Sequence, residues 1–207
     1  MPLELETKLR VPDRLTMERL LSDAEIFDAQ ISEMRAVAMQ AFYYDTAKDI
    51  LNERKWTLRI RREDGVSIGV FKSGPTVEDS VFTREELSCA ADTIEEAVPL
   101  LVGLGAPPEL LDMQPFVERC RIEFTRTVCC LRLEDGSACE FAADDGVIYA
   151  DEKSEPMLEM ELELLSGPPD AMTELAVRLK ERYSLQKEQY SKYGRALRLL
   201  RSRAVSM

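Results

Sequence analysis

The sequence predicts an α+β protein, in which an antiparallel β-barrel or sandwich has helices packed on its outside. Three observations indicate this class. Short segments that alternate polar and apolar residues recur along the 207 residues, as expected of strands that bury one face. Turn sequences, such as the one around Asp64-Gly65, separate neighbouring segments. Only a few segments have the 3.6-residue period of an amphipathic helix.

The first half of the chain predicts strands interrupted by short helices. Residues 3–10 alternate leucines with charged residues and predict a strand, and Asp13 is placed to cap a helix that ends near Leu21. In a strand over 56–62, Trp56 lies on the face opposite to Arg59. The other elements expected here are a strand over 34–44, a helical turn over 47–54, a second hairpin arm over 66–72, a strand over 81–88, a helix from Asp92 to about Leu104 and a helical turn over 107–113.

The second half continues this pattern. The elements expected are strands over 117–127, 128–134, 138–144, 147–150 and 157–165, a helix that follows Gly167-Pro168-Pro169-Asp170 and ends near Tyr183, and a basic helix over 186–203. The turns are expected at Asp135-Gly136 and Asp145-Gly146. We find neither an internal repeat nor a clear linker, so residues 1–207 are expected to form a single domain.

Composition restricts the chemistry and the partners. The chain has no histidine, which excludes Ser–His–Asp and Cys–His catalysis and histidine-ligated zinc. The net charge of −12 argues against non-specific nucleic-acid binding. Five cysteines without a C-x-x-C pair indicate reduced thiols, and no segment is apolar enough for a signal peptide or a membrane span. We therefore expect a soluble, cytoplasmic protein that binds neither nucleic acid nor membrane.

The polar faces of the predicted strands carry charges of both signs. These charged residues are Glu4, Glu6, Lys8, Arg59, Arg61, Lys72, Arg84, Glu86, Glu140, Asp144, Glu159, Glu161 and Glu163. A solvated face explains any one strand, but the repetition predicts an interior with an acidic wall and a basic wall. Clustered carboxylates favour Mg²⁺ or Mn²⁺, and clustered arginines match phosphate oxygens. Together they predict a metal-dependent site for a short polyphosphate.

One segment near the N-terminus resembles a family signature. Glu4-Leu5-Glu6-Thr7-Lys8 is similar to the E-x-E-x-K motif of CYTH proteins, the triphosphate tunnel metalloenzymes. The resemblance continues in the family's order through residues 43–46, 56–61, Lys72, residues 83–86, Arg126, residues 140–146, 158–164 and Ser191-Lys192. It departs from the family after Lys192, where Tyr193 takes the place of a small residue.

The resemblance implies a closed tunnel of eight antiparallel strands with the charged residues inside. It implies metal ligation by Glu4, Glu6, Glu159 and Glu161, with Asp144 as a helper. It implies triphosphate binding by Lys8, Arg59, Arg61, Lys72, Arg84, Arg126 and Lys192. Lys8, Glu140 and Asp144 are expected to act in the reaction, although either carboxylate or a metal-activated water could take the proton. Glu163 is interpreted as either a rim carboxylate or a ligand, Tyr43 and Trp56 as packing on the outside, and Arg10, Arg121 and Arg132 as surface charges.

The resemblance implies an enzyme, and we expect an inorganic triphosphatase that converts tripolyphosphate to pyrophosphate and phosphate with Mg²⁺ or Mn²⁺. Thiamine triphosphatase and class IV adenylate cyclase remain alternatives within the family. A non-catalytic module that binds polyphosphate or nucleotide is an alternative of another class. The expected partner is a small triphosphate, and the expected assembly is a monomer or a homodimer.

Overall fold

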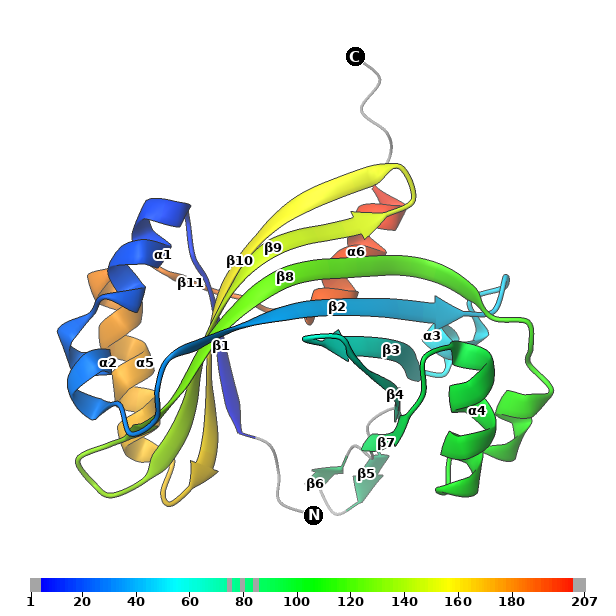
Figure 1. Ribbon diagram of the computed structural model, residues 1–207, viewed down its shortest axis with the longest axis horizontal. Coiled ribbons are helices and arrows are strands. Elements are labelled where there is room, and N and C mark those ends of the chain that lie inside the picture. Colours follow the sequence, from blue (N-terminus) through cyan, green and yellow to red (C-terminus); the bar gives the residue numbers. More distant parts are fainter. Residues whose placement is uncertain (1–4, 74–75, 79–80, 84–85, 203–207) are drawn as a thin grey trace. The chain divides into compact units, whose positions relative to one another are not determined.

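The computed structural model describes residues 5–73, 76–78, 81–83 and 86–202. Nine strands pair in the order β11-β1-β10-β9-β8-β2-β3-β4-β7 (Figure 1). Their bounds are β1 Glu6–Arg10, β2 Arg35–Asp45, β3 Thr57–Glu63, β4 Val66–Lys72, β7 Glu86–Ala90, β8 Val117–Arg132, β9 Ala138–Ala150, β10 Lys153–Ser166 and β11 Gln186–Lys187. A separate two-stranded sheet joins β5, Thr76–Glu78, and β6, Val81–Thr83.

The sheet does not close, so the expected eight-stranded barrel is wrong. Among the described residues, each end strand of the series, β11 and β7, pairs with a single neighbour, and they do not pair with each other. β11 has only two residues and offers few backbone groups for further pairing. Alternation in a sequence fixes which face of a strand is apolar, but closure depends on pairing between distant strands.

Several predicted boundaries are also wrong. β8 and β9 are each one continuous strand, where the sequence predicted two. Asp135-Gly136 does form a turn, because Gly136 takes a φ of 83° that favours glycine. Asp145-Gly146 remains within β9, and Arg14 donates hydrogen bonds to both carboxylate oxygens of Asp145, at 2.9 and 3.1 Å. The same dipeptide pattern therefore marks a turn at only one of its two positions.

The helices also differ in part from those expected. Asp13 caps α1, Arg14–Leu21, as predicted, whereas α2, Ala24–Ala29, was not predicted. The remaining helices are α3 Ile50–Glu53, α4 Ile94–Gly103, α5 Asp170–Arg182 and α6 Lys192–Arg201, with a 3₁₀ turn over Pro108–Leu111. Thr93 caps α4 in place of Asp92, and α6 begins six residues after the expected start at Gln186. In the part of the chain that the structure describes, no helix is long and apolar enough to cross a membrane.

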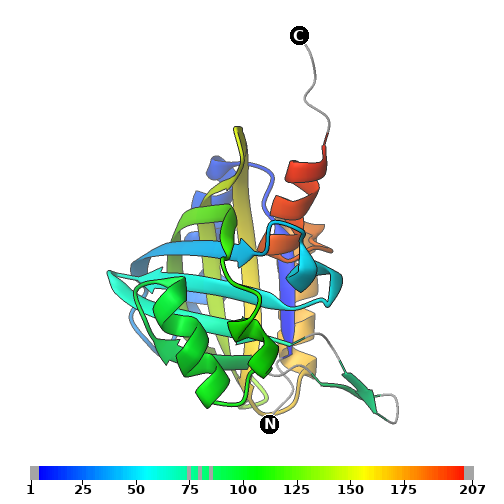
Figure 2. The ribbon, with the colours of Figure 1, turned by 90° about the vertical axis from the view of Figure 1, so that its right-hand side faces the viewer.

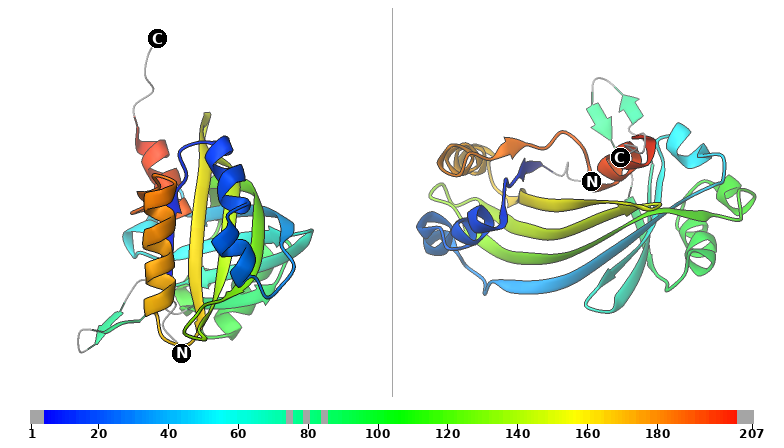
Figure 3. Two further views of the ribbon diagram at one scale, coloured as in Figure 1. Left: turned by 90° about the vertical axis from the view of Figure 1, so that its left-hand side faces the viewer. Right: turned by 90° about the horizontal axis from the view of Figure 1, so that it is seen from above.

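The chain divides into two compact units. The first comprises Met1–Val37, Phe124–Val147 and Pro156–Ser191, and the second comprises Ala38–Glu123, Ile148–Glu155 and Lys192–Met207. In the first unit, α1, α2 and α5 lie against one face of the strands (Figure 3). Leu9, Met160 and Leu162 from β1 and β10 pack there with Leu20 of α1 and Leu179 of α5. Burial of each such side chain contributes about 2 kcal/mol to the free energy of folding, so this face of the strands is held in the hydrophobic core.

Asp23 joins the helices of the first unit. Its Oδ1 accepts a hydrogen bond from the Glu25 amide at 2.9 Å and caps α2. Its Oδ2 accepts from Arg182 Nη1 and from the Tyr183 hydroxyl, both at 2.6 Å. Burial acts to raise the pKa of Asp23, but the hydrogen bonds from Tyr183 and Arg182 outweigh it and leave that pKa below its ordinary value.

This network predicts a pH dependence of stability. Since the pKa of Asp23 is lowered on folding, its contribution is complete above the unfolded value of about 4 and disappears as the pH falls through the folded value. The difference in free energy of unfolding between wild type and Asp23→Asn should therefore be constant from about pH 7 to 5 and shrink below about pH 4. Urea denaturation at each pH measures it, with the exposed Asp28→Asn as control. A difference that grew with acidity would contradict the prediction.

In the second unit, α4 covers the strands of a hairpin and its neighbour (Figure 2). Leu58 and Ile60 of β3 and Phe71 of β4 pack against Val98 and Leu101 of α4. The helix lies so close to β4 that a Cβ on Gly69 would be 2.5 Å from the Cβ of Ala97 and 3.2 Å from the Sγ of Cys89. The absence of a side chain at Gly69 therefore allows α4 to pack closely against β4.

We predict that Gly69→Ala lowers the free energy of unfolding by about 1–3 kcal/mol, because the added methyl group must push α4 away from β4. Chemical denaturation measures the change. Gly103→Ala, at the end of α4, is the matched control, since nothing lies within 4 Å of the added Cβ. We expect it to leave stability unchanged or to raise it by less than about 1 kcal/mol. Equal losses in the two variants would contradict this explanation.

Candidate metal and anion site

Three buried carboxylates lie together in the first unit. Asp144 of β9 and Glu159 and Glu161 of β10 are 0%, 0% and 8% exposed, and each offers an oxygen within 4.8 Å of the other two. The alternation of β10 explains their position, because Met160 and Leu162 point into the helix-covered core. Glu159 and Glu161 alternate with these two residues and therefore point to the other face of the strand.

Two cations, Arg126 and Lys8, offset part of the negative charge of this cluster. Arg126 of β8 donates to Asp144 through Nε and Nη2, both at 2.8 Å, and its Nη2 also lies 2.5 Å from Glu161 Oε2. Lys8 Nζ lies 3.0 Å from Glu161 Oε1 and 3.0 Å from Glu6 Oε1. Burial acts to lower the pKa of Arg126, but Asp144 and Glu161 outweigh it and raise that pKa, so the guanidinium keeps its charge.

The donor set fits a hard divalent cation. Three carboxylate oxygens are the ligands that Mg²⁺ and Mn²⁺ prefer, whereas softer metals favour nitrogen or sulfur. The oxygens that Asp144, Glu159 and Glu161 offer lie within 4.8 Å of one another, so these three carboxylates could together hold such an ion.

The other predicted acidic residues are placed as follows. Glu6 of β1 joins the cluster through Lys8, and it pairs in register with Glu163 of β10. Glu163 is outside the three-carboxylate cluster among the described residues. Glu140 is half-buried in β9, four residues before Asp144, and so shares its face of the strand. Glu4 lies outside the described residues.

The predicted basic residues of the second unit come from several elements. Arg61 of β3 forms an ion pair with Glu63, with Nε 2.9 Å from Oε1, and Lys72 of β4 forms one with Glu86 of β7. Lys192 is the half-buried first residue of α6. Arg84 lies outside the described residues.

Arg59 of β3 has a buried donor that no described group satisfies. Its Nε is buried and makes no hydrogen bond within the described part of the chain, while its Nη1 donates to the Tyr43 hydroxyl at 3.1 Å. An unsatisfied buried donor is costly, and a guanidinium is well suited to an anionic acceptor. The unsatisfied Nε is therefore consistent with a phosphate ligand.

The prediction for Tyr43 is wrong. It is 4% exposed but lies opposite Arg59 in the β2–β3 register, so its side chain shares the face of Arg59. The register could have revealed this, had the pairing of β2 with β3 been known. Trp56 does pack against the outer core, edge-on to Phe71 with ring centroids 5.6 Å apart, as predicted. The three arginines interpreted as surface charges, Arg10, Arg121 and Arg132, are exposed.

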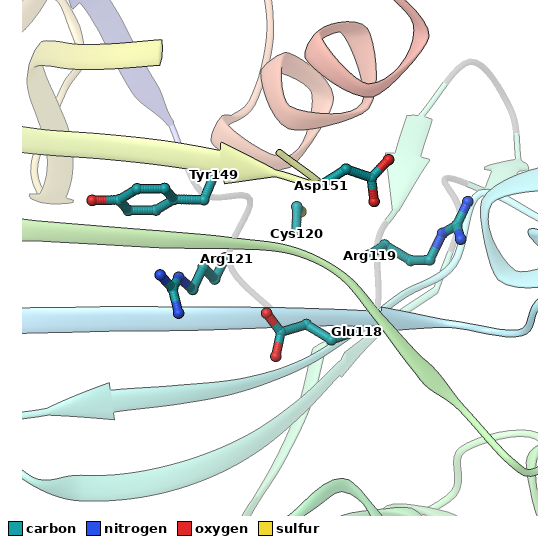
Figure 4. A pocket seen from close by; sticks show the side chains of 6 residues that line it. All are labelled: Glu118, Arg119, Cys120, Arg121, Tyr149 and Asp151. Atoms are coloured by element: carbon teal, nitrogen blue, oxygen red, sulfur yellow. The ribbon is translucent and has the colours of Figure 1, made fainter. Parts of the chain in front are cut away.

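A pocket in the second unit contains none of the predicted site residues (Figure 4). It is lined by Glu118, Arg119, Cys120, Arg121, Tyr149 and Asp151. The guanidinium of Arg121 lies over the Tyr149 ring, 4.7 Å from its centroid, and Arg119 forms an ion pair with Asp49 at 2.9 Å. Among the described residues, the carboxylates of this pocket belong to no group of three that could hold a metal, so the pocket is a weaker candidate than the carboxylate cluster.

The antiparallel sheet and the buried carboxylate cluster together define an α+β protein with a candidate site for a divalent cation. Residues 2–197 match the model of the CYTH domain, and the chain belongs to this family. Over 166 residues it is 29% identical to the inorganic triphosphatase of Haemophilus influenzae, with 79% of this chain and 46% of that protein covered. The chain thus spans about half the length of that curated relative.

Solved structures agree with the fold. One is an adenylyl cyclase candidate from Hippeastrum with a dominant triphosphatase activity, at a TM-score of 0.61 and 19% identity, covering 95% of this chain and 96% of that one. Another is a protein from Pyrococcus horikoshii, at a TM-score of 0.54 and 19% identity, covering 95% and 99%. At these identities the likeness supports the fold alone.

Proposed function

We propose that this protein is a metal-dependent hydrolase of short triphosphates, which converts tripolyphosphate to pyrophosphate and phosphate. The observation that carries the proposal is the buried cluster of Asp144, Glu159 and Glu161, held beside Arg126 and Lys8. A module that only binds anions needs basic residues and has no need of a buried triad of carboxylates. Family membership and similarity to an inorganic triphosphatase support the same reading.

In this proposal the acidic residues hold Mg²⁺ or Mn²⁺. The ligands would be Glu4, Glu6, Glu159 and Glu161, assisted by Asp144. When bound, the ion would neutralise phosphate charge and lower the pKa of water. Asp144 accepts two hydrogen bonds from Arg126, which fix the positions of its oxygens.

The basic residues would bind and align the triphosphate. They are Lys8, Arg59, Arg61, Lys72, Arg84, Arg126 and Lys192. Most lie on strands, whose backbone hydrogen bonds fix the positions from which their donors project, as the electrostatic stabilisation of phosphoryl transfer requires. The unsatisfied Nε of Arg59 supports a direct contact with a phosphate oxygen.

A water molecule would attack the terminal phosphorus. The new bond forms between its oxygen and that phosphorus, the bridging P–O bond breaks, and pyrophosphate leaves. Glu140 is the better candidate to take the proton from water, because both oxygens of Asp144 already accept hydrogen bonds from Arg126. Glu140 is half-buried on the same face of β9. The base role of Glu140 predicts a loss of kcat in Glu140→Gln.

A substrate panel tests the proposal. Tripolyphosphate, thiamine triphosphate, ATP and pyrophosphate are each incubated with Mg²⁺, with Mn²⁺ and with EDTA. We expect phosphate release to be fastest from tripolyphosphate and to stop in EDTA. Cyclic AMP with pyrophosphate would identify a cyclase instead, and preferred cleavage of thiamine triphosphate would identify a thiamine triphosphatase. Tight binding of tripolyphosphate without turnover under either metal would identify a binding module and overturn the proposal.

A further inference from the structure

Two tyrosines of the second unit stack on each other. The rings of Tyr43 in β2 and Tyr193 in α6 have centroids 4.7 Å apart and planes only 8° from parallel. Burial raises the pKa of Tyr193, so its hydroxyl is neutral at physiological pH.

The stacked Tyr43 contacts Arg59. Its hydroxyl accepts the hydrogen bond from Nη1 at 3.1 Å, and the Arg59 guanidinium carbon lies 5.9 Å from the centroid of its ring. Nη1 lies on the edge of the guanidinium away from the Nε–H. The bond to Tyr43 therefore leaves the edge formed by Nε and Nη2 for a second acceptor, and a carboxylate or phosphate binds that edge with two parallel hydrogen bonds. The buried Nε lacks an acceptor among the described residues.

Tyr193 is held in place because α6 is anchored at both its middle and its end. Lys153 Nζ, at the start of β10, donates to the carbonyl oxygens of Leu199 and Leu200, both at 3.1 Å. The buried Arg195 of α6 forms an ion pair with Glu155. A helix tied at these points restricts the Tyr193 ring, which in turn restricts the Tyr43 ring by stacking.

We propose that Tyr193 is a positioning residue: by stacking on Tyr43 it fixes the hydroxyl that orients Arg59, so that the Nε edge of Arg59 faces a phosphate oxygen of the substrate. The inference rests on the proposed function, in which Arg59 binds the triphosphate. Tyr193 acts through Tyr43 and Arg59, and the aromatic ring of Tyr193 is the part that the role needs.

Steady-state kinetics with tripolyphosphate test the role. Tyr193→Leu should raise KM about tenfold and change kcat less than about threefold, since a binding donor loses its orientation. Tyr193→Phe keeps the ring and should stay within about twofold of wild type. Tyr43→Phe keeps the stack but lacks the acceptor, so it should resemble Tyr193→Leu. In an Arg59→Lys background, Tyr193→Leu should add no further loss. An additive loss there, or an unchanged KM in Tyr193→Leu, would overturn the inference.

A second measurement does not depend on turnover. The Nε–H signal of Arg59 in ¹⁵N NMR is identified by its absence in Arg59→Lys. The signal should move in Tyr193→Leu and stay in place in Tyr193→Phe and in the control Tyr149→Leu, whose ring lies under Arg121. A signal unmoved by Tyr193→Leu would overturn the inference whatever the kinetics show. A moved signal in a protein that hydrolyses no triphosphate would support the contact and overturn the proposed function instead.

Discussion

Replacing Glu161 by Gln should reduce tripolyphosphate hydrolysis by at least about a hundredfold while the protein remains folded. Glu161 belongs to the three-carboxylate cluster and also contacts Lys8 and Arg126, so the variant removes the charge of a carboxylate that we propose as a metal ligand. Loss of even an outer partner of a metal ligand costs about ten- to a hundredfold, and a direct ligand should cost more. Initial rates with Mg²⁺ and with Mn²⁺ measure the loss of activity, and calorimetry measures the loss of Mn²⁺ affinity.

The control for this variant is Glu134→Gln. Glu134 lies at the exposed β8–β9 hairpin, and its replacement changes the net charge by the same amount. We expect wild-type rates and wild-type Mn²⁺ affinity from it. If Glu161→Gln kept both its rate and its Mn²⁺ affinity, the cluster would not be the metal site.

Replacing Arg126 by Leu should destabilise the protein when metal is absent. Removal of one partner from a buried ion pair costs about 3–5 kcal/mol, because the remaining charges are left without compensation. Three carboxylates remain within 4.8 Å of one another, and Asp144 is fully buried. For a chain of about 200 residues, this loss should lower Tm by about 10 °C in EDTA.

Addition of Mg²⁺ or Mn²⁺ should recover part of this loss. A cation that binds the cluster replaces the missing positive charge, so Tm should rise more in Arg126→Leu than in wild type. Thermal scans with EDTA and with each metal measure the difference. Arg132→Leu, at the exposed end of the same strand, should change Tm by less than about 2 °C in either condition. A wild-type Tm for Arg126→Leu in EDTA would contradict the proposed charge balance.

The acidic cluster could be predicted because it depends on local alternation. Glu159 and Glu161 share a face of any extended strand, whatever that strand pairs with, and Met160 shows which face is the core. The contact of Arg126 with Asp144 depends instead on the β8–β9 hairpin, whose turn at Asp135-Gly136 is a strong local signal. Features that depend on a single strand or a single hairpin could therefore be predicted from the sequence.

Features that depend on contacts between distant parts of the chain could not be predicted from the sequence. The Tyr43–Tyr193 stack joins residues 150 positions apart, and no local pattern specifies that α6 meets β2. Whether the sheet closes into a barrel could not be predicted either, because closure requires the two end strands to pair and alternation within a strand does not specify that pairing. The roles of individual site residues and the single domain over 1–207 stay predictions.

In β10, the proposed metal ligands alternate along the strand with residues that pack in the hydrophobic core. Met160 and Leu162 are interleaved with Glu159 and Glu161, so deletion of a single residue within the strand would exchange the two sets and move carboxylates under α5. A point substitution changes one side chain of this strand and leaves the others on their faces. Insertion or deletion of a single residue instead moves every residue beyond it to the opposite face. We would therefore expect natural variation in β10 to proceed by replacement, with insertions and deletions confined to its ends.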